Sequence, residues 1–214
     1  MSLAERLTAC YTGAVYDVMR DMGRRDCVLP NTIRPIDPTI KLAGRVWTAE
    51  GRPADGADHD ETLLSWTGLL SAAPADHVVI CQPNDSTIAH MGELSAETLK
   101  LRGVLGYICD GGSRDIEFLE RMKFPVLCRY YTPLDIVGRW LVDSMGEPIE
   151  IGGIRIATGD YVLADQDGVV VVPAEIAEDV VAETERIMST ESDLRRAILD
   201  GMDPQEAYKK YGVF

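Results

Sequence analysis

The segment 92–130 constrains the fold more than any other part of the chain. Apolar residues at helical spacing predict a helix over about 93–102, and a buried strand follows over 104–109. A second helix over about 115–123 and a second strand over 125–130 come next, with short connections. Helix and strand that alternate in this way require parallel strands joined by crossover helices. We therefore expect an α/β fold with central parallel strands.

The preceding residues supply further elements of the same kind. Apolar positions at helical spacing predict one helix over about 3–22, and three prolines predict an extended connection over 28–41. Residues 42–49 are typical of a strand. A helix is predicted over 58–73 and a buried strand over 76–82.

The chain changes character after Pro133. The runs IEIGGIRI, GDYVLAD and DGVVVVP predict short strands joined by turns, in an antiparallel, β-rich part. A long charged helix is predicted over about 174–201, followed by a short tail over 202–214. No linker or repeat interrupts the pattern, so we expect a single domain over 1–214.

Composition excludes some classes of function. The net charge is −14, from 21 basic and 35 acidic residues, which argues against a nucleic-acid or anionic-membrane surface. No apolar run approaches the roughly 20 residues of a membrane span. The chain has five cysteines and no CxxC motif, and its first residues are typical of an amphipathic helix and not of a signal peptide. These features predict buried, reduced thiols in a cytoplasmic protein.

One candidate site lies where the helix over 93–102 begins. Helix starts leave backbone N–H groups unpaired, and the helix dipole favours anions there. The amides of Leu94 and Ser95 are therefore suited to a substrate carboxylate. Glu93 would repel that carboxylate unless a cation or a proton lies between them, which is a first indication of a metal. The alternative is that Glu93 only complements the helix dipole.

A second candidate site follows the strand over 104–109. Gly111 and Gly112 permit a tight turn, and Arg114 and Asp115 then lie at the carboxyl end of a parallel strand. Arginine can bind a carboxylate or an enolate oxygen, and aspartate can bind Mg²⁺. The alternatives are a surface charge for Arg114 and a helix-start acid for Asp115. The sequence alone does not settle whether this loop and the start at Glu93 share one edge of the sheet.

The histidines add little to either candidate site. His59 and His77 lack metal-type partners at helical spacing and are interpreted as surface or structural residues. His90 lies three residues before Glu93 and is a candidate for a supporting position behind the site.

The run GELSAETLKLRGVLGYICDGGSRD, followed by FPVLCRYYTP, resembles the family of RraA-like proteins and class II 4-hydroxy-4-methyl-2-oxoglutarate aldolases. The later run GDYVLADQDGVVVVPAEIAEDV is similar to the same family, and the resemblance covers roughly 3–201. It implies a β/β/α swivelling-type fold. It also implies a homotrimer or a hexamer with sites at subunit interfaces.

The resemblance also implies roles for particular residues. Asp115 corresponds to the aspartate that binds Mg²⁺ or Mn²⁺ in the aldolases, and Arg114 to the arginine that contacts the pyruvate part. Glu93 stands 21 residues before Arg114, where the family has an acid that acts through metal-bound water. Leu94 and Ser95 carry the amides that hold the pyruvate carboxylate.

A further glutamate of the family comes from a neighbouring subunit's C-terminal helix. Glu191 is the best match, and Glu185 is the second choice. One departure concerns an acid that the family motif has three residues after the metal-binding aspartate. Phe118 stands at that position here, and the acid is Glu117, one residue early. The departure bears on the aldolase branch more than on the broader family.

The function implied is that of a lyase. It would cleave a 4-hydroxy-2-oxo acid to pyruvate through a metal-stabilised enolate, with oxaloacetate decarboxylation as a possible second activity. The alternative is a protein-binding regulator of ribonuclease activity without turnover. Arg114, Asp115 and Glu93 together favour the enzyme.

Overall fold

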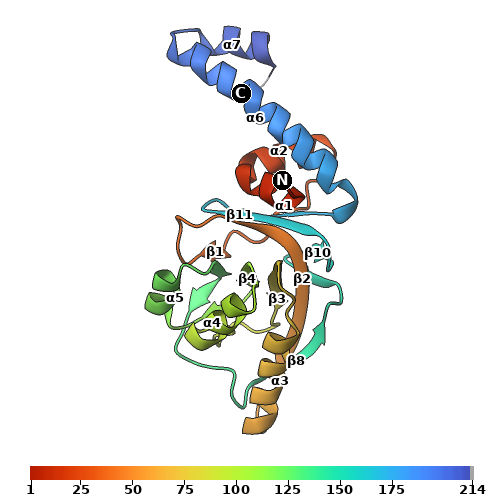
Figure 1. Ribbon diagram of the computed structural model, residues 1–214, viewed down its shortest axis with the longest axis vertical. Helices are drawn as coiled ribbons and strands as arrows, with labels where there is room; N and C mark the ends of the chain where they lie inside the picture. Colours follow the sequence, from red (N-terminus) through yellow and green to blue (C-terminus); the bar gives the residue numbers. More distant parts are fainter. Residues whose placement is uncertain (213–214) are drawn as a thin grey trace.

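An eight-stranded mixed sheet organises the computed structural model, which describes residues 1–212 (Figure 1). The strands follow one another in space in the order β1 (Arg34–Pro35), β6 (Val126–Cys128), β4 (Gly106–Cys109), β3 (His77–Gln82), β2 (Leu42–Pro53), β11 (Tyr161–Asp165) and β12 (Gly168–Val172). A further strand, β8 (Trp140–Met145), pairs with β2 outside this path. The sheet curls into a nearly closed, barrel-like form, and the predicted α/β class is confirmed.

The centre of the sheet is parallel, as the alternation of helix and strand predicts. Strands β2, β3, β4 and β6 pair in parallel, and three helices connect them: α3 (His59–Ala72), α4 (Glu93–Leu101) and α5 (Ile116–Met122). One face of the sheet packs against these helices. Trp66, Leu99 and Leu119 of the helices lie in one buried cluster with Val79 and Tyr107 of the strands.

The opposite face of the parallel strands packs against the β-rich part of the chain. Val78, Ile80 and Ile108 are buried there with Ile149 and Ile154. The last two belong to the antiparallel pair β9 (Ile149–Ile151) and β10 (Ile154–Ile156). A small parallel pair, β5 (Gly112–Ser113) with β7 (Tyr130–Tyr131), completes the strands. Successive strand residues point to opposite faces, so both faces of the central strands are apolar.

Strand β2 shapes the barrel because it has three partners. Its first residues pair with β11, its middle with β3 and its last with β8, and the β8 register shifts at Glu50/Gly51. The shift bends the strand. A Cβ at Gly51 would lie 2.0 Å from the ring of Trp140, so only glycine admits this indole against the bend.

Two helices form at the N-terminus where the sequence predicts one over 3–22. They are α1 (Leu3–Ala9) and α2 (Thr12–Asp21), separated by Cys10 in an extended conformation. Asp165 accepts hydrogen bonds from the backbone N–H of Thr12 (2.9 Å) and from its hydroxyl (2.7 Å). This long-range contact starts the second helix, and apolar spacing does not reveal it.

The C-terminal helix is present as predicted, but the segment after it is not a plain tail. A 3₁₀ turn, η1 (Ala174–Ile176), leads into α6 (Ala177–Leu199), and α7 (Pro204–Tyr211) follows. Asp203 caps α7 through the amides of Gln205 and Glu206. Figure 1 shows α6 running away from the sheet with α7 at its far end. Residues 213 and 214 of the predicted tail lie outside the described residues.

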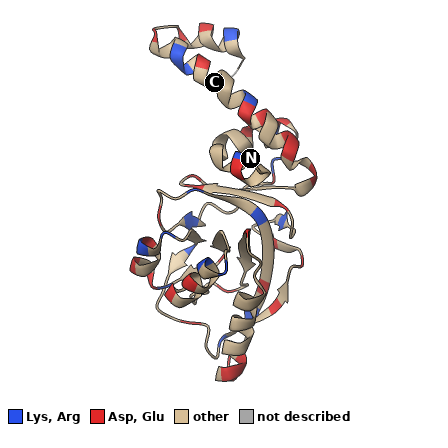
Figure 2. Cartoon of the chain, viewed as in Figure 1, with Lys and Arg blue, Asp and Glu red and all other residues tan. Residues whose placement is uncertain are grey.

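The burial of the cysteines follows the prediction. All five cysteines are buried and unpaired. Figure 2 shows Lys and Arg scattered among Asp and Glu over the drawn elements, with no basic face in this view. Within residues 1–212, no helix combines the length and the apolar character needed to cross a bilayer.

Candidate functional site

The two candidate loops lie at one edge of the sheet. Because β3 and β4 are parallel neighbours, the helix that leaves β3 starts at the edge where β4 ends. The segment before α4 runs beside the segment after β4. The His90 N–H donates to the Gly112 carbonyl (2.9 Å), and the Arg114 N–H donates to the Met91 carbonyl (2.9 Å). The structure thus brings together two sites whose relation the sequence leaves open.

A direct hydrogen bond joins the two sites. The backbone N–H of Glu93, the first residue of α4, donates to Oδ2 of Asp115 at 3.0 Å. Asp115 precedes α5 in a left-handed conformation (φ 58°, ψ 37°), which aspartate tolerates better than most residues. This backbone turns the carboxylate back toward α4. Oδ1 has no hydrogen-bond partner within residues 1–212, so it stays available to a ligand.

Arg114 lies between two carboxylates. Its Nε is 3.6 Å from Oδ2 of Asp115, and its Nη1 is 3.4 Å from Oδ2 of Asp135. The side chain remains 41% exposed, so the guanidinium is held in place without being buried. A planar guanidinium with a second donor edge suits a carboxylate or a developing enolate oxygen.

Gly92 permits the close approach of these groups. A Cβ at this position would lie 2.6 Å from Oδ2 of Asp115 and 3.1 Å from Cγ of Arg114. Any other residue at the start of α4 would push the aspartate and the arginine away from the helix. The glycine is therefore required by the site, whereas its own backbone conformation is open to any residue (φ −150°).

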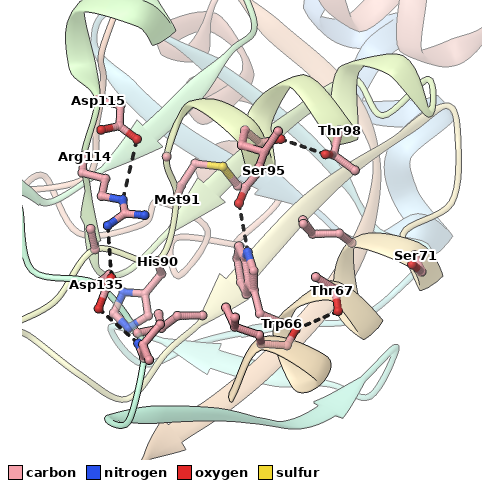
Figure 3. Close-up of a pocket in the computed structure, with 17 residues that line it drawn as sticks. Trp66, Thr67, Ser71, His90, Met91, Ser95, Thr98, Arg114, Asp115 and Asp135 are labelled. Atoms are coloured by element: carbon pink, nitrogen blue, oxygen red, sulfur yellow. Dashed lines mark hydrogen bonds and ion pairs between the residues drawn. The ribbon is translucent and has the colours of Figure 1, made fainter. Parts of the chain in front are cut away.

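These groups border a cavity of about 460 Å³. Figure 3 shows Arg114, Asp115 and Asp135 on one side of it, and Trp66, Thr67 and Ser71 of α3 on the other. Ser95 and Thr98 of α4 lie between the two sides, and Leu94 of the same helix also lines the cavity. The cavity has the size of a site for a small molecule.

The amides predicted to hold a carboxylate are free at this cavity. Gly92, at the N-cap of α4, offers no side-chain cap, and Glu93 uses its N–H on Asp115. The N–H groups of Leu94 and Ser95 have no acceptor within residues 1–212. Two unpaired amides at a helix start, next to Arg114, have the character that suits an anion.

The donor set fits one kind of metal better than others. Within residues 1–212, no three His, Cys, Asp or Glu side chains gather closely enough to hold an ion by themselves. A zinc-type site of three or four protein ligands is therefore a poor match. Mg²⁺ keeps several waters and takes one or two carboxylates, and Asp115, with its free oxygen, meets that requirement.

His90 supports the cavity from inside the protein. Its side chain is fully buried, and neither ring nitrogen has a hydrogen-bond partner within residues 1–212. The ring packs edge-on against Trp140 with centroids 5.2 Å apart, and Nε2 is 4.0 Å from Asp85. Burial lowers the pKa of His90 to about 4, although Asp85 opposes the shift. The imidazole is neutral near pH 7.

This histidine predicts an acid-sensitive stability. The unfolded chain protonates His90 near its ordinary pKa of about 6.5, whereas the folded chain resists until about pH 4. Neutral His90 therefore adds to the free energy of unfolding above pH 6.5. This contribution, about 3 kcal/mol, is lost as the pH falls toward 4. Urea unfolding between pH 7.5 and 4.5 measures it. His90→Phe should flatten the slope, and the exposed His59→Gln should not. Equal slopes in all three proteins would contradict the assignment.

Several predicted site residues lie elsewhere in the single chain. Glu93 contributes its backbone to the site, but its side chain does not line the cavity. Phe118 lies on the outer side of α5, where the guanidinium of Arg121 is 5.5 Å from its ring, and Glu117 pairs with Arg121. Neither takes part in the cavity, so the departure from the family motif leaves the cavity itself unchanged.

The two candidate glutamates of α6 are distant from the cavity of their own chain. Glu191 accepts a hydrogen bond from the hydroxyl of Tyr11, whose pKa is raised to about 12, first by burial and then by this bond. Glu185 binds the guanidinium of Arg6 through both oxygens (3.0 and 2.8 Å). Both carboxylate oxygens of Glu185 are thus paired within its own chain, whereas Glu191 makes a single hydrogen bond.

Among the cavity residues that sequence reasoning misses, Asp135 and Trp66 make specific polar contacts. Asp135 follows Pro133 in a loop without periodicity, and only the folded chain places it against Arg114. Trp66 donates its indole N–H to the Ser95 hydroxyl at 2.9 Å and so ties α3 to α4. A buried tryptophan in a helix is ordinarily interpreted as core, and no local signal separates the two roles.

Comparisons with known proteins agree with this fold. The family model described as "RraA-like: Aldolase/RraA" matches residues 12–171. A protein of Halalkalibacterium halodurans named "Putative 4-hydroxy-4-methyl-2-oxoglutarate aldolase" is 28% identical over 180 residues, which are 84% of this chain and 82% of that protein.

Solved structures extend the likeness. A crystal structure described as one of novel cellulases from microbes associated with the gut ecosystem has a TM-score of 0.83 at 33% identity, covering 89% of this chain and 86% of that one. Streptomyces coelicolor RraAS2, described as an unusual member of the RNase ES inhibitor RraA protein family, has a TM-score of 0.79 at 23% identity, covering 91% and 96%. These names differ in function, so activity has to be argued from the site. The family match over most of the chain shows that it belongs to the RraA-like, Aldolase/RraA family.

Proposed function

We propose that this protein is a metal-dependent lyase that cleaves a 4-hydroxy-2-oxo acid to pyruvate. One observation carries the proposal: Arg114, the free oxygen of Asp115 and the free amides of Leu94 and Ser95 converge on one cavity. These are the groups needed to hold a 2-oxo carboxylate and to face negative charge on its 2-oxo oxygen. The aldolase name of a relative that aligns with 84% of the chain supports the same reading.

Each group has a task that follows from its position. The amides of Leu94 and Ser95 bind the substrate carboxylate, and Arg114 faces the 2-oxo oxygen, where charge develops as the C3–C4 bond breaks. Asp115 would hold Mg²⁺ or Mn²⁺, with Asp135 keeping Arg114 in place. The ion, when bound, supplies Lewis acidity toward the 2-oxo group.

The direct test is pyruvate release. A coupled assay with oxaloacetate and with a set of 4-hydroxy-2-oxo acids, both diacids and acids with an apolar end, should show turnover of at least one substrate with Mg²⁺ or Mn²⁺ and none after EDTA treatment. Readdition of the ion should restore it, because Asp115 is suited to a cation that exchanges with water. Full turnover of metal-free protein would contradict the metal dependence. Absence of pyruvate from every substrate would contradict the lyase and favour the alternative, a protein-binding regulator of ribonuclease activity.

Glu93 is proposed to relay the proton of the substrate's C4 hydroxyl through a water. Its position at the first turn of α4, bonded to Asp115 through its backbone, supports this role. Cleavage requires removal of that proton, whereas decarboxylation of oxaloacetate does not. Glu93→Gln should lower cleavage by about 10²-fold and change decarboxylation by much less. Glu97→Gln, on the exposed face of the same helix, is the matched control. Equal losses in both reactions would remove Glu93 from the relay.

The proposed assembly is a homotrimer or a hexamer in which Glu191 completes the site of a neighbouring subunit. Helix α6 leads away from its own sheet, which supports such a reach (Figure 1). The pairing of Glu185 with Arg6 favours Glu191 over Glu185 for this role.

A further inference from the structure

The cavity has a charged end and an uncharged end. Arg114, Asp115 and Asp135 lie at one end, and α3 forms the opposite wall (Figure 3). Among the described residues that line the cavity, Arg114 is the single Lys or Arg, and two carboxylates already lie within 3.6 Å of it. A substrate carboxylate bound to the α4 amides would occupy the anion-binding groups of this end, so none would remain for a second carboxylate.

The far wall is built mainly from apolar side chains. Leu63, Trp66 and Leu70 of α3 line it, and Thr67 and Ser71 of the same helix add hydroxyl groups without charge. Leu94, Ile136 and Val137 add further apolar surface to the cavity. The indole N–H of Trp66 is engaged by Ser95, so the ring presents no free donor. Its edge contact with Trp140, with centroids 6.0 Å apart, fixes the ring in position.

The polar side chains of this wall offer little to a second anion. The hydroxyl of Thr67 donates to the Leu63 carbonyl (2.7 Å), and that of Thr98 donates to the Leu94 carbonyl (2.8 Å). Ser71 offers one hydroxyl and no positive charge. His90 is neutral near pH 7, because burial holds its pKa at about 4. Arg102 reaches the same end of α3, but its guanidinium donates to the Ser71 carbonyl and does not line the cavity. A carboxylate at this wall would lose hydration without gaining a cation.

We infer that the preferred substrate of this site is a 4-hydroxy-2-oxo acid whose part beyond C4 is apolar and uncharged, and not a 4-hydroxy-2-oxo diacid. The inference rests on the proposed function for the position of the 2-oxo acid unit. The apolar tail would lie against Trp66 and Leu70, and burial of its methyl groups would supply the selectivity.

Binding of unreactive 2-oxo acids tests the tail independently of turnover. With Mg²⁺ present, titration calorimetry should show 4-methyl-2-oxopentanoate binding about tenfold or more tightly than pyruvate. It should show 2-oxoglutarate binding no more tightly than pyruvate. Tighter binding of 2-oxoglutarate than of 4-methyl-2-oxopentanoate would overturn the inference. It would mean that a cation, from Arg102 or from a neighbouring subunit, binds the second carboxylate. Loss of that tighter binding in Arg102→Gln would identify Arg102 as the cation, and its persistence would point to the neighbouring subunit.

A charge placed on the far wall should reverse the preference. Thr67→Arg adds a cation at an exposed position of α3 that lines the cavity, and it should shift the affinity ratio toward 2-oxoglutarate by about tenfold or more. Gly68→Arg adds the same charge one residue on, where a side chain meets open space, and should leave the ratio unchanged. Thr67→Met tests bulk without charge and should not favour 2-oxoglutarate.

The outcomes separate this inference from the proposed function. Pyruvate released from dicarboxylate substrates in preference to apolar ones would overturn the inference and leave the lyase standing. Selective binding of 4-methyl-2-oxopentanoate without pyruvate release from any 4-hydroxy-2-oxo acid would contradict the lyase and leave the tail preference standing. An equal shift by Thr67→Arg and Gly68→Arg would show a general field effect and would overturn the role of the α3 wall.

Discussion

Arg114→Lys is expected to lower both aldol cleavage and oxaloacetate decarboxylation by about 10²-fold or more. The physical reason lies in the shape of the guanidinium. Arg114 reaches Asp115 with one nitrogen and Asp135 with another, so its remaining donor edge has a fixed direction. A lysine keeps the charge but has no planar fork, and its ammonium can settle on either carboxylate. The negative charge that develops on the 2-oxo oxygen would then lack its oriented donor.

Steady-state kinetics with both substrates measure this effect. Arg129→Lys is the matched control, because Arg129 pairs with Asp110 at 3.5 Å and does not line the cavity. It should leave kcat within a few-fold of the parent protein. Both variants should unfold at similar urea concentrations, since neither arginine is buried in the core. Loss of cleavage with full decarboxylation in Arg114→Lys would show that the residue does not face the oxygen common to both reactions.

Mixed oligomers test the second large effect, the completion of each site by Glu191 of another subunit. Asp115→Asn and Glu191→Ala are each expected to lower turnover by about 10²-fold or more. The first keeps an oxygen that can accept the Glu93 N–H, so the local structure should persist. When the two variants are unfolded and refolded together, some sites combine an intact Asp115 with an intact Glu191 from the next chain. Equal mixing in a cyclic oligomer should restore up to about a quarter of the sites.

Size-exclusion chromatography and native mass spectrometry establish that the subunits have mixed. Glu185→Ala is the control, because Glu185 pairs with Arg6 of its own chain, so this variant should keep its turnover without any partner variant. No recovery in demonstrably mixed oligomers would show that Glu191 is not shared. A fully active monomer would remove the premise of a site between subunits.

The parallel core could be predicted because its signals are local. Apolar runs at β3, β4 and β6, separated by helical periodicity at α4 and α5, allow few other arrangements. Arg114 and Asp115 could be named as candidates for the same reason, since a glycine pair at the end of a parallel strand lies at the edge where such sheets bind ligands. Helix boundaries in this part agree with the prediction within about two residues.

The errors lie where distant contacts decide local structure. The predicted helix over 3–22 is broken because Asp165, far along the chain, binds Thr12 and starts α2 there. The segment after α6 forms α7, capped by Asp203, although its polar composition resembles a tail. Neither outcome follows from hydrophobic spacing. That spacing indicates which residues are buried, but it does not indicate where a polar side chain caps a helix.

Sequence patterns were enough to predict the fold class and the parallel core, and they identified Arg114 and Asp115 as candidate site residues. Only the tertiary structure decided that Glu93 bonds Asp115 through its backbone, and that Asp135 and Trp66 border the same cavity. The physical reason is the range of the interactions. Strand and helix periodicity depend on neighbours within one element, whereas a cavity depends on where separate elements approach, and that is set by packing of the whole chain.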